Sequence, residues 1–194
     1  MMQVLDRNEW ELSLFDPYLD PADELPRRVL AAVREALDSG DAQLARDLVV
    51  LGEPQDPGAA LLVVLALLVA GHEGSLCLGL ETTRLVALLT RAGCEPGDAT
   101  AAAKRIHAWL KKKNGLGALV TLVGSMEETG TTPMVVLKQD GSLVRVWWQR
   151  LFRAERRLEQ AFLERRQLAP VTITASLKKA ALARGTAFAG MTLN

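Results

Sequence analysis

Apolar residues recur along most of the chain at the three- and four-residue spacing of amphipathic helices, which predicts a mainly α protein. A first helix is expected over residues 26–39, closed by a glycine, and a second is expected with Asp41 as its N-cap. Residues 59–71 are apolar on every side and predict a central helix. Two further amphipathic helices are expected over residues 82–92 and 98–113.

The second half of the chain adds extended segments. A short extended piece is expected over residues 75–80, and the pattern also allows a short helical piece at 116–123. Runs of β-prone residues at 133–138 and 143–149 flank an Asp-Gly turn, which predicts a β-hairpin. An amphipathic helix is expected over 150–166. The expected fold is therefore a small, mainly α domain with one late β-hairpin followed by a helix.

Three parts are expected along the chain. Residues 1–25 are rich in proline and acidic residues and predict an irregular arm that docks through its aromatic side chains. Residues 26–166 form the helical domain, and residues 167–194 form a tail or linker.

Composition narrows the class of protein. The 194 residues are 49% hydrophobic and 24% charged, which excludes a disordered tail, a collagen-like fibre and a disulfide mini-protein. Lys+Arg and Asp+Glu both number 23, so net charge attracts the chain neither to nucleic acid nor to a membrane. Acidic residues prevail in residues 1–60 and basic ones in residues 145–184, which suggests different neighbours for the two ends.

The cellular compartment follows from what the sequence contains. Cys77 and Cys94 show no paired spacing, which fits a reducing cytoplasm. The N-terminal residues are polar and acidic and do not resemble a signal peptide. The longest apolar run, 59–70, is shorter than the roughly 20 residues that span a bilayer. We expect a soluble cytoplasmic protein that does not enter a membrane.

Motifs for chemistry are weak. No phosphate-binding loop is found, because the Gly115-Leu-Gly segment follows no predicted strand. His72 and Cys77 come nearest to zinc-ligand spacing, but Cys77 lies in an apolar stretch and is better interpreted as a packed thiol. Ser125 lacks the pattern of a nucleophile elbow. We expect no catalytic residue, no metal and no cofactor.

Two features of the C-terminal half indicate binding. Adjacent residues of a strand point to opposite faces, so either Trp147 or Trp148 is expected to leave the core or to meet a partner. The basic helix 150–166 fits a nucleic-acid face, or a solvated face on which Glu155 and Glu159 pair with neighbouring arginines. Both interpretations of the helix remain open at this point.

Three early segments resemble one family. Residues 44–54, the apolar run 61–70, and the sequence Gly71-His-Glu-Gly-Ser-Leu-Cys-Leu-Gly-Leu80 resemble the N-terminal region of RecD, the alpha subunit of exodeoxyribonuclease V (RecBCD). The family has a Gly-His-Val-Cys-Leu-x-Leu stretch after an apolar helix. The matching residues here are His72, Cys77, Leu78 and Leu80, with two residues inserted after the histidine.

A second resemblance to the same family lies in the hairpin region. The chain has Thr132-Pro133-Met134 before an apolar strand, then Asp140-Gly141, a second strand, and a helix start rich in Arg and Glu. Phe152 stands where the family usually has tryptophan. The resemblance covers roughly residues 38–166, and the order and spacing of the motifs carry it.

The resemblance implies a role in assembly. In the family this region precedes an ATP-dependent motor that moves 5′ to 3′ on DNA in double-strand-break repair and recombination. The resemblance implies that this region docks onto a RecC-like and possibly a RecB-like subunit, and that DNA is reached through the complex. This chain has no Walker A loop, so it is expected to be either a fragment or a motor-less relative, inactive as a helicase by itself. The expected partner-binding residues are Trp10, Phe15, Trp147, Trp148, Arg150, Arg153 and Arg157.

An alternative is a stand-alone, winged-helix-like module that binds nucleic acid. The helices at 82–92 and 98–113, followed by the hairpin, suit that arrangement. Its phosphate contacts would be Lys104, Arg105 and Lys111–Lys113.

Overall fold

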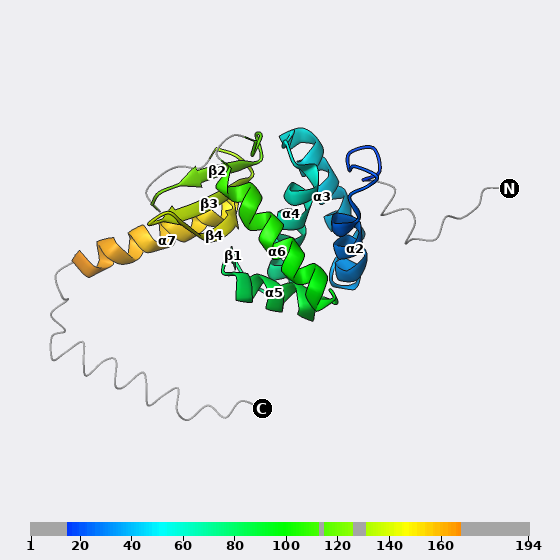
Figure 1. Cartoon of the computed structure of the whole chain (residues 1–194). Helices are drawn as coiled ribbons and strands as arrows, with labels where there is room; N and C mark the ends of the chain where they lie inside the picture. Colours follow the sequence, from blue (N-terminus) through cyan, green and yellow to red (C-terminus); the bar gives the residue numbers. More distant parts are fainter. Residues whose placement is uncertain (1–14, 113–114, 126–130, 168–194) are drawn as a thin grey trace, which may run out of the picture. The chain divides into compact units, whose positions relative to one another are not determined.

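A computed structural model describes residues 15–112, 115–125 and 131–167 (Figure 1). The described chain is mainly helical with a small four-stranded sheet, which confirms the predicted fold class. The elements are α2 (Glu24–Val33), the 3₁₀ helix η1 (Arg34–Ala36), α3 (Ser39–Gly52), α4 (Pro57–His72), β1 (Cys77–Gly79), α5 (Thr82–Arg91), α6 (Pro96–Lys111), β2 (Val120–Val123), β3 (Met134–Gln139), β4 (Ser142–Trp148) and α7 (Gln149–Gln167).

Two compact units make up the chain, residues 1–156 and 157–194, and their boundary falls inside α7. All other described elements belong to the first unit. Within the second unit, residues 157–167 are helical and the apolar side chains of Leu158, Phe162 and Leu163 are exposed.

The central helix of the first unit is α4, as its apolar sequence predicted. Asp56 caps it by accepting a hydrogen bond of 2.9 Å from the backbone N–H of Ala59, and Pro57 occupies the first turn, where its missing N–H costs nothing. Every residue from Gly58 to Ala70 is buried. Each buried leucine stabilises the fold by about 2 kcal/mol relative to an exposed one. Among the described residues, no helix has both the length and the apolar character needed to cross a membrane.

Helix α3 begins earlier than predicted. Asp38, rather than Asp41, is the N-cap: its side chain accepts from the backbone N–H of Asp41, and the Asp41 side chain accepts from that of Asp38. This reciprocal capping box places Gly40 inside the first turn of α3. The expectation that Gly40 closes the preceding helix is therefore wrong, since α2 ends at Val33 and continues as η1.

The hairpin of β3 and β4 lies at the centre of the sheet, whose order is β1-β4-β3-β2. Its turn residues Asp140 and Gly141 both have positive φ, at 48° and 80°, as a two-residue hairpin turn requires. The helical piece allowed at 116–123 is wrong, because Val120–Val123 pair in parallel with β3 as strand β2. Backbone pairing with a distant strand decided the conformation of this short apolar run.

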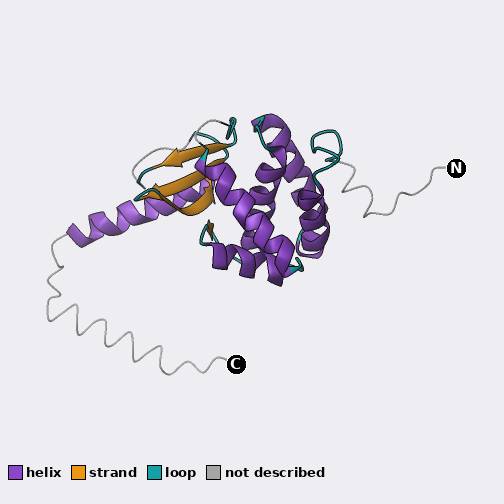
Figure 2. Cartoon of the chain, viewed as in Figure 1, coloured by secondary structure: helices purple, strands orange, loops and turns teal. Residues whose placement is uncertain are grey.

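Both faces of the sheet are covered (Figure 2). Leu78, Val136 and Val146 join the main core with the helices. On the other face, Trp147 packs in a second cluster with Phe152, from the first turns of α7, and the two rings meet edge to face at 5.5 Å. Trp147 is 1% exposed and Trp148 packs against the main core. One of the two was expected to leave the core or to meet a partner: Trp147 does not leave it, because the first turns of α7 cover the second face, whereas Trp148 is only half-buried.

The turn between α5 and α6 is four residues long, from Ala92 to Glu95. Gly93 has φ of +107°, and a Cβ atom on it would lie 2.7 Å from the backbone oxygen of Ala32. Glycine is therefore required here both for the backbone conformation and for the close approach to α2. Arg28 of α2 and Asp98 of α6 reinforce this contact through two hydrogen bonds of 2.9 Å.

Candidate functional site

The residues expected to meet a partner lie in different environments. Phe15 and Trp147 are 1% exposed and belong to hydrophobic clusters, so the expectation that they contact a partner is wrong for this folded state. Their aromatic rings are used for packing. Trp148 is half-buried, Arg150, Arg153 and Arg157 are exposed, and Trp10 lies outside the described residues.

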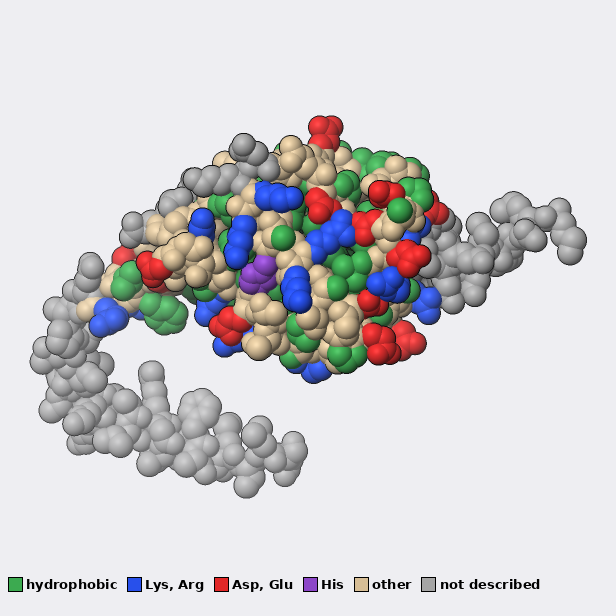
Figure 3. All heavy atoms as spheres, in the orientation of Figure 1, with side chains coloured by type: hydrophobic (Ala, Val, Ile, Leu, Met, Phe, Trp, Pro, Cys, Tyr) green, Lys and Arg blue, Asp and Glu red, His purple; other side chains and the backbone are tan. Residues whose placement is uncertain are grey.

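The cations expected to contact phosphate also divide into two groups. Arg105 donates hydrogen bonds of 2.7 Å to Asp23 and 2.6 Å to Asp56, which raise the pKa of its guanidinium and occupy it inside the fold. Lys104, Lys111 and Lys112 are exposed, and Lys113 lies outside the described residues. Figure 3 shows basic side chains over α6 and acidic ones toward α2.

One trio of side chains has metal-ligand character. Atoms of Asp38, Asp41 and His72 lie within 4.8 Å of one another, and His72 Nε2 is 2.6 Å from an oxygen of Asp41. Both aspartates are already engaged in the capping box of α3. Helix capping therefore explains why these carboxylates lie together, and the histidine adds a link between the start of α3 and the end of α4.

The thiols of Cys77 and Cys94 both have raised pKa values, which lowers their reactivity. Cys94 is buried, and burial raises its pKa to about 11. Burial also raises the pKa of Cys77, although the nearby Arg145 opposes that effect. Because the thiolate is the reactive form, neither cysteine is set up as a nucleophile at neutral pH.

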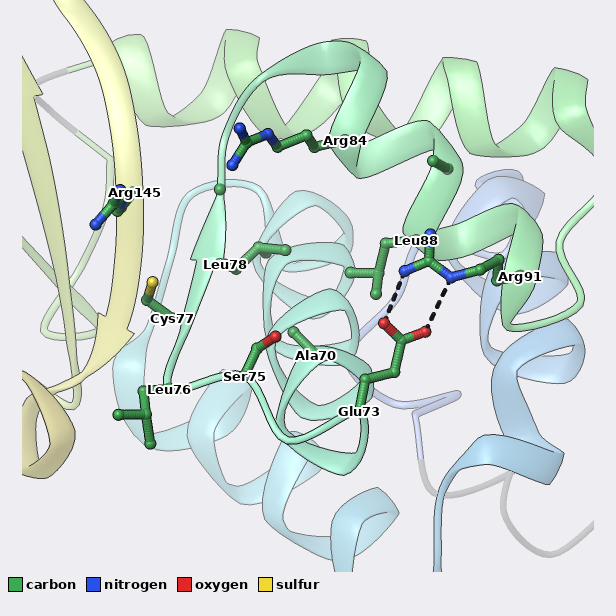
Figure 4. A pocket seen from close by; sticks show the side chains of 12 residues that line it. Ala70, Glu73, Ser75, Leu76, Cys77, Leu78, Arg84, Leu88, Arg91 and Arg145 are labelled. Carbon is green, nitrogen blue, oxygen red and sulfur yellow. Dashed lines mark hydrogen bonds and ion pairs between the residues drawn. The ribbon is translucent and has the colours of Figure 1, made fainter.

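A groove of about 460 Å³ lies between β1, α5 and one residue of β4 (Figure 4). In the close-up, Arg145 and Cys77 lie on one side of β1, and Arg84, Leu88 and Arg91 extend from α5 on the other. Its lining consists of Ala70, Glu73, Ser75, Leu76, Cys77, Leu78, Gly79, Arg84, Ala87, Leu88, Arg91 and Arg145.

One wall of the groove is the open edge of the sheet. Strand β1 is an edge strand that pairs on one side with β4. The N–H of Leu80 donates to the carbonyl of Val144 at 2.9 Å, and backbone groups alternate sides along an antiparallel strand. The polar backbone groups of Leu78 therefore face β4, whereas those of Cys77 and Gly79 face away from it.

Positive charge prevails in the lining, which contains three arginines and one glutamate. Arg91 is paired with Glu73 through hydrogen bonds of 2.7 and 3.3 Å. Among the described residues, Arg84 forms an exposed ion pair with Glu81, one turn away. No carboxylate in the described part of the chain forms an ion pair with Arg145. The groove therefore combines an open strand edge with cationic side chains, which suits binding of an anionic chain.

Sequence reasoning missed this groove. Its three arginines, Arg84, Arg91 and Arg145, come from two separate parts of the chain and form no local motif. The available signal was Gly79 within a β-prone segment, because a glycine in a strand often marks the close approach of another group. The arrangement offers binding groups, and it does not bring together a nucleophile and a base.

Comparison of the chain with protein-family models, with curated proteins and with solved structures finds no match in any of the three. The functional argument therefore depends on the residues and their geometry.

Proposed function

We propose that this chain is a non-catalytic assembly domain of a RecD-like helicase subunit. One observation carries the proposal: the two resembling segments, far apart in sequence, lie side by side as strands β1 and β4. Leu78 of the first segment is in register with Val146 of the second. Motifs that resemble a single family region thus form one structural unit, as expected if they share an origin.

Further packing supports the same proposal. The resembling segment 61–70 is the buried centre of α4, against which Leu78 packs in the main core. Phe152, which stands where the family usually has tryptophan, fills the second cluster beside Trp147. The aromatic ring at this position helps to cover the outer face of the sheet.

In this role the domain docks its subunit onto a RecC-like partner, with a RecB-like subunit in the same assembly. DNA and ATP are handled by other parts of that cytoplasmic complex, which serves double-strand-break repair and recombination. The contribution of this chain is a folded surface, and its exposed arginines and the groove are the available binding features.

The test is association with a cognate RecC-like subunit, measured by size-exclusion chromatography with light scattering at moderate salt. A stoichiometric complex, heavier than the partner alone by the 21.1 kDa of this chain, is the expected result. A chain that elutes unchanged in the presence of folded partner would contradict the proposal.

A second candidate is a winged-helix module that binds nucleic acid, and the order of elements favours it. Strand β1 lies between α4 and α5 in sequence and pairs with the outgoing strand of the hairpin β3–β4, as in winged-helix domains. Helices α5 and α6 are joined by a short glycine-containing turn, as in helix-turn-helix motifs. Lys104 and Lys111 are exposed on α6.

This candidate predicts affinity for duplex DNA that falls steeply with salt, because lysines release counterions from phosphates. Fluorescence anisotropy with a labelled duplex measures it, and a double variant Lys104→Gln/Lys111→Gln is expected to reduce the salt dependence. Binding that is absent or insensitive to salt would remove this candidate.

A further inference from the structure

We propose that the groove between β1 and α5 binds an extended acidic peptide segment of the partner protein, which adds to the open edge of β1 as a further strand (Figure 4). The identity of the partner rests on the proposed docking function, whereas the chemistry of the segment follows from the groove itself.

The edge of β1 supplies the pairing groups. The N–H and C=O groups of Cys77 and Gly79 point away from β4, toward the side of the strand on which the described part of the chain places no other strand. An extended segment can satisfy them with its own backbone, as in recognition by strand addition. Strand β1 is three residues long, Cys77–Gly79, and at a rise of about 3.3 Å per residue it covers about 10 Å, so about three residues of the segment can pair with it.

One face of the added strand meets apolar side chains. Leu78 points toward the main core, and Ala70 and Leu88 lie beside it in the lining of the groove. Alternate side chains of the segment that share the face of Leu78 therefore meet an apolar surface. Apolar residues are favoured at those positions.

The other face of the added strand meets arginines. Arg145 is the cross-strand neighbour of Gly79, so its side chain leaves the sheet on the same face that a Gly79 side chain would occupy. A Cβ atom built on Gly79 would lie 3.3 Å from Cδ of Arg84. The side chain of Arg84 thus lies over the position where Gly79 has no side chain, and Arg145 leaves the neighbouring strand on the same face.

This placement selects acidic residues on that face. Arg145 forms no ion pair with the described carboxylates, and the exposed pair of Arg84 with Glu81 is weak. A carboxylate on this face of the added strand gains charge-assisted hydrogen bonds from one or both guanidinium groups. The groove therefore selects a segment in which apolar and acidic residues alternate.

The probe is a fluorescein-labelled seven-residue peptide in which Val alternates with Asp, and the measurement is its anisotropy with the 194-residue chain. We expect saturable binding that an unlabelled copy displaces. A peptide with Asn at every Asp position is expected to bind about tenfold more weakly or worse, because it cannot form the charged hydrogen bonds. Equal affinity of the two peptides would overturn the charge argument.

Backbone pairing is tested with two N-methylated peptides. One carries methyl groups on the Asp nitrogens and the other on the Val nitrogens, because alternate N–H groups of a strand face opposite edges. Loss of binding in only one of them is expected, with the Asp set affected if the segment is antiparallel to β1 and the Val set if it is parallel. An equal effect of both sets would overturn strand addition.

Variants of the chain locate the binding site. The double variant Arg84→Gln/Arg145→Gln is expected to weaken peptide binding about tenfold or more. Gly79→Val keeps both arginines but displaces the Arg84 side chain that lies over the glycine, and it is expected to abolish binding. The charge-matched control is Arg34→Gln/Lys138→Gln, which lies outside the groove lining and should bind as the unaltered chain does. Circular dichroism confirms that each variant is folded, and full binding by the folded arginine variant would refute the assignment.

Three further outcomes distinguish this inference from a nucleic-acid site and from the assembly proposal. If a ten-nucleotide oligothymidine displaces the peptide and loses affinity in the same arginine variant, the groove is a nucleic-acid site and the peptide assignment is overturned. If a RecC-like complex forms but the peptides do not bind, only the groove assignment fails. If the peptides bind but no complex forms, the assembly proposal fails instead.

Discussion

The indole N–H of Trp147 donates a hydrogen bond of 2.6 Å to the carboxylate of Glu155. The strand β4 and the first turns of α7 are joined by this bond and by the edge-to-face contact between Trp147 and Phe152. A polar group on an otherwise apolar surface is thereby satisfied, which allows the second face of the sheet to be buried.

Replacing Glu155 with leucine should destabilise the chain by about 1–3 kcal/mol, because the buried indole N–H loses its acceptor. Urea unfolding followed by circular dichroism measures the loss. Glu155→Gln keeps an acceptor and serves as the control, with an expected loss of less than half as much. Unchanged stability in the leucine variant would mean that the hydrogen bond contributes nothing to the fold.

Two glycines near the α5–α6 turn should respond in opposite directions to alanine. Gly93→Ala forces a side chain into a backbone with φ of +107° and against the oxygen of Ala32, so it should cost about 2 kcal/mol or more. Gly97 lies in the first turn of α6 with open space around it, and Gly97→Ala should stabilise by up to about 1 kcal/mol. The urea midpoints of the two variants are compared directly. Similar shifts in both would contradict the claim that glycine is required at position 93.

Arg105 should be important for stability, and its replacement tests this. The variant Arg105→Met leaves Asp23 and Asp56 half-buried without their shared partner and should cost about 2 kcal/mol. Arg84→Gln removes an exposed ion pair and is the matched control, with no expected change in the free energy of unfolding. An unchanged free energy of unfolding in Arg105→Met would show that hydrogen bonds to solvent replace both hydrogen bonds of Arg105 at no cost.

The same network predicts a dependence on pH. Burial alone would raise the pKa of Asp56, but the hydrogen bonds from Arg105 and from the backbone of Ala59 outweigh it and lower the pKa below the ordinary value of 3.8. Its contribution to stability is therefore complete well above pH 3.8 and is lost as the pH falls through the lower, folded pKa. Urea midpoints between pH 7 and pH 3 should fall less in Asp56→Asn than in the unaltered chain, and parallel profiles would contradict this.

The two cysteines should differ in accessibility. Cys77 is half-exposed in the groove, whereas Cys94 is buried with a pKa of about 11. A thiol-specific chromogenic disulfide should therefore react with one thiol in the folded chain and with the second only in urea. The variant Cys77→Ser should abolish the first reaction, and labelling of Cys94 without denaturant would place that side chain at the surface instead.

Much of the architecture followed from local patterns. The apolar run that became α4, the amphipathic spacing of α5 and α6, and the Asp140-Gly141 turn each contain their own signal within a few residues. The wrong predictions arose where a local sequence signal is compatible with more than one structure. Gly40 is compatible with a helix end or with the first turn of a capped helix, and the reciprocal bonds of Asp38 and Asp41 selected the second.

The candidate site was hardly predictable, because its parts come from three separate segments. The sequence alone determined a mainly α domain with a late hairpin, since helix periodicity and turn chemistry are properties of neighbouring residues. Tertiary structure decided that Val120–Val123 form a strand, that Trp147 is buried under the first turns of α7, and that Arg105 is enclosed by two aspartates. It also placed Arg84 over Gly79, with Arg145 on the same face of the neighbouring strand. These outcomes depend on which distant segments pack together. The free energy of that packing is distributed over the whole core.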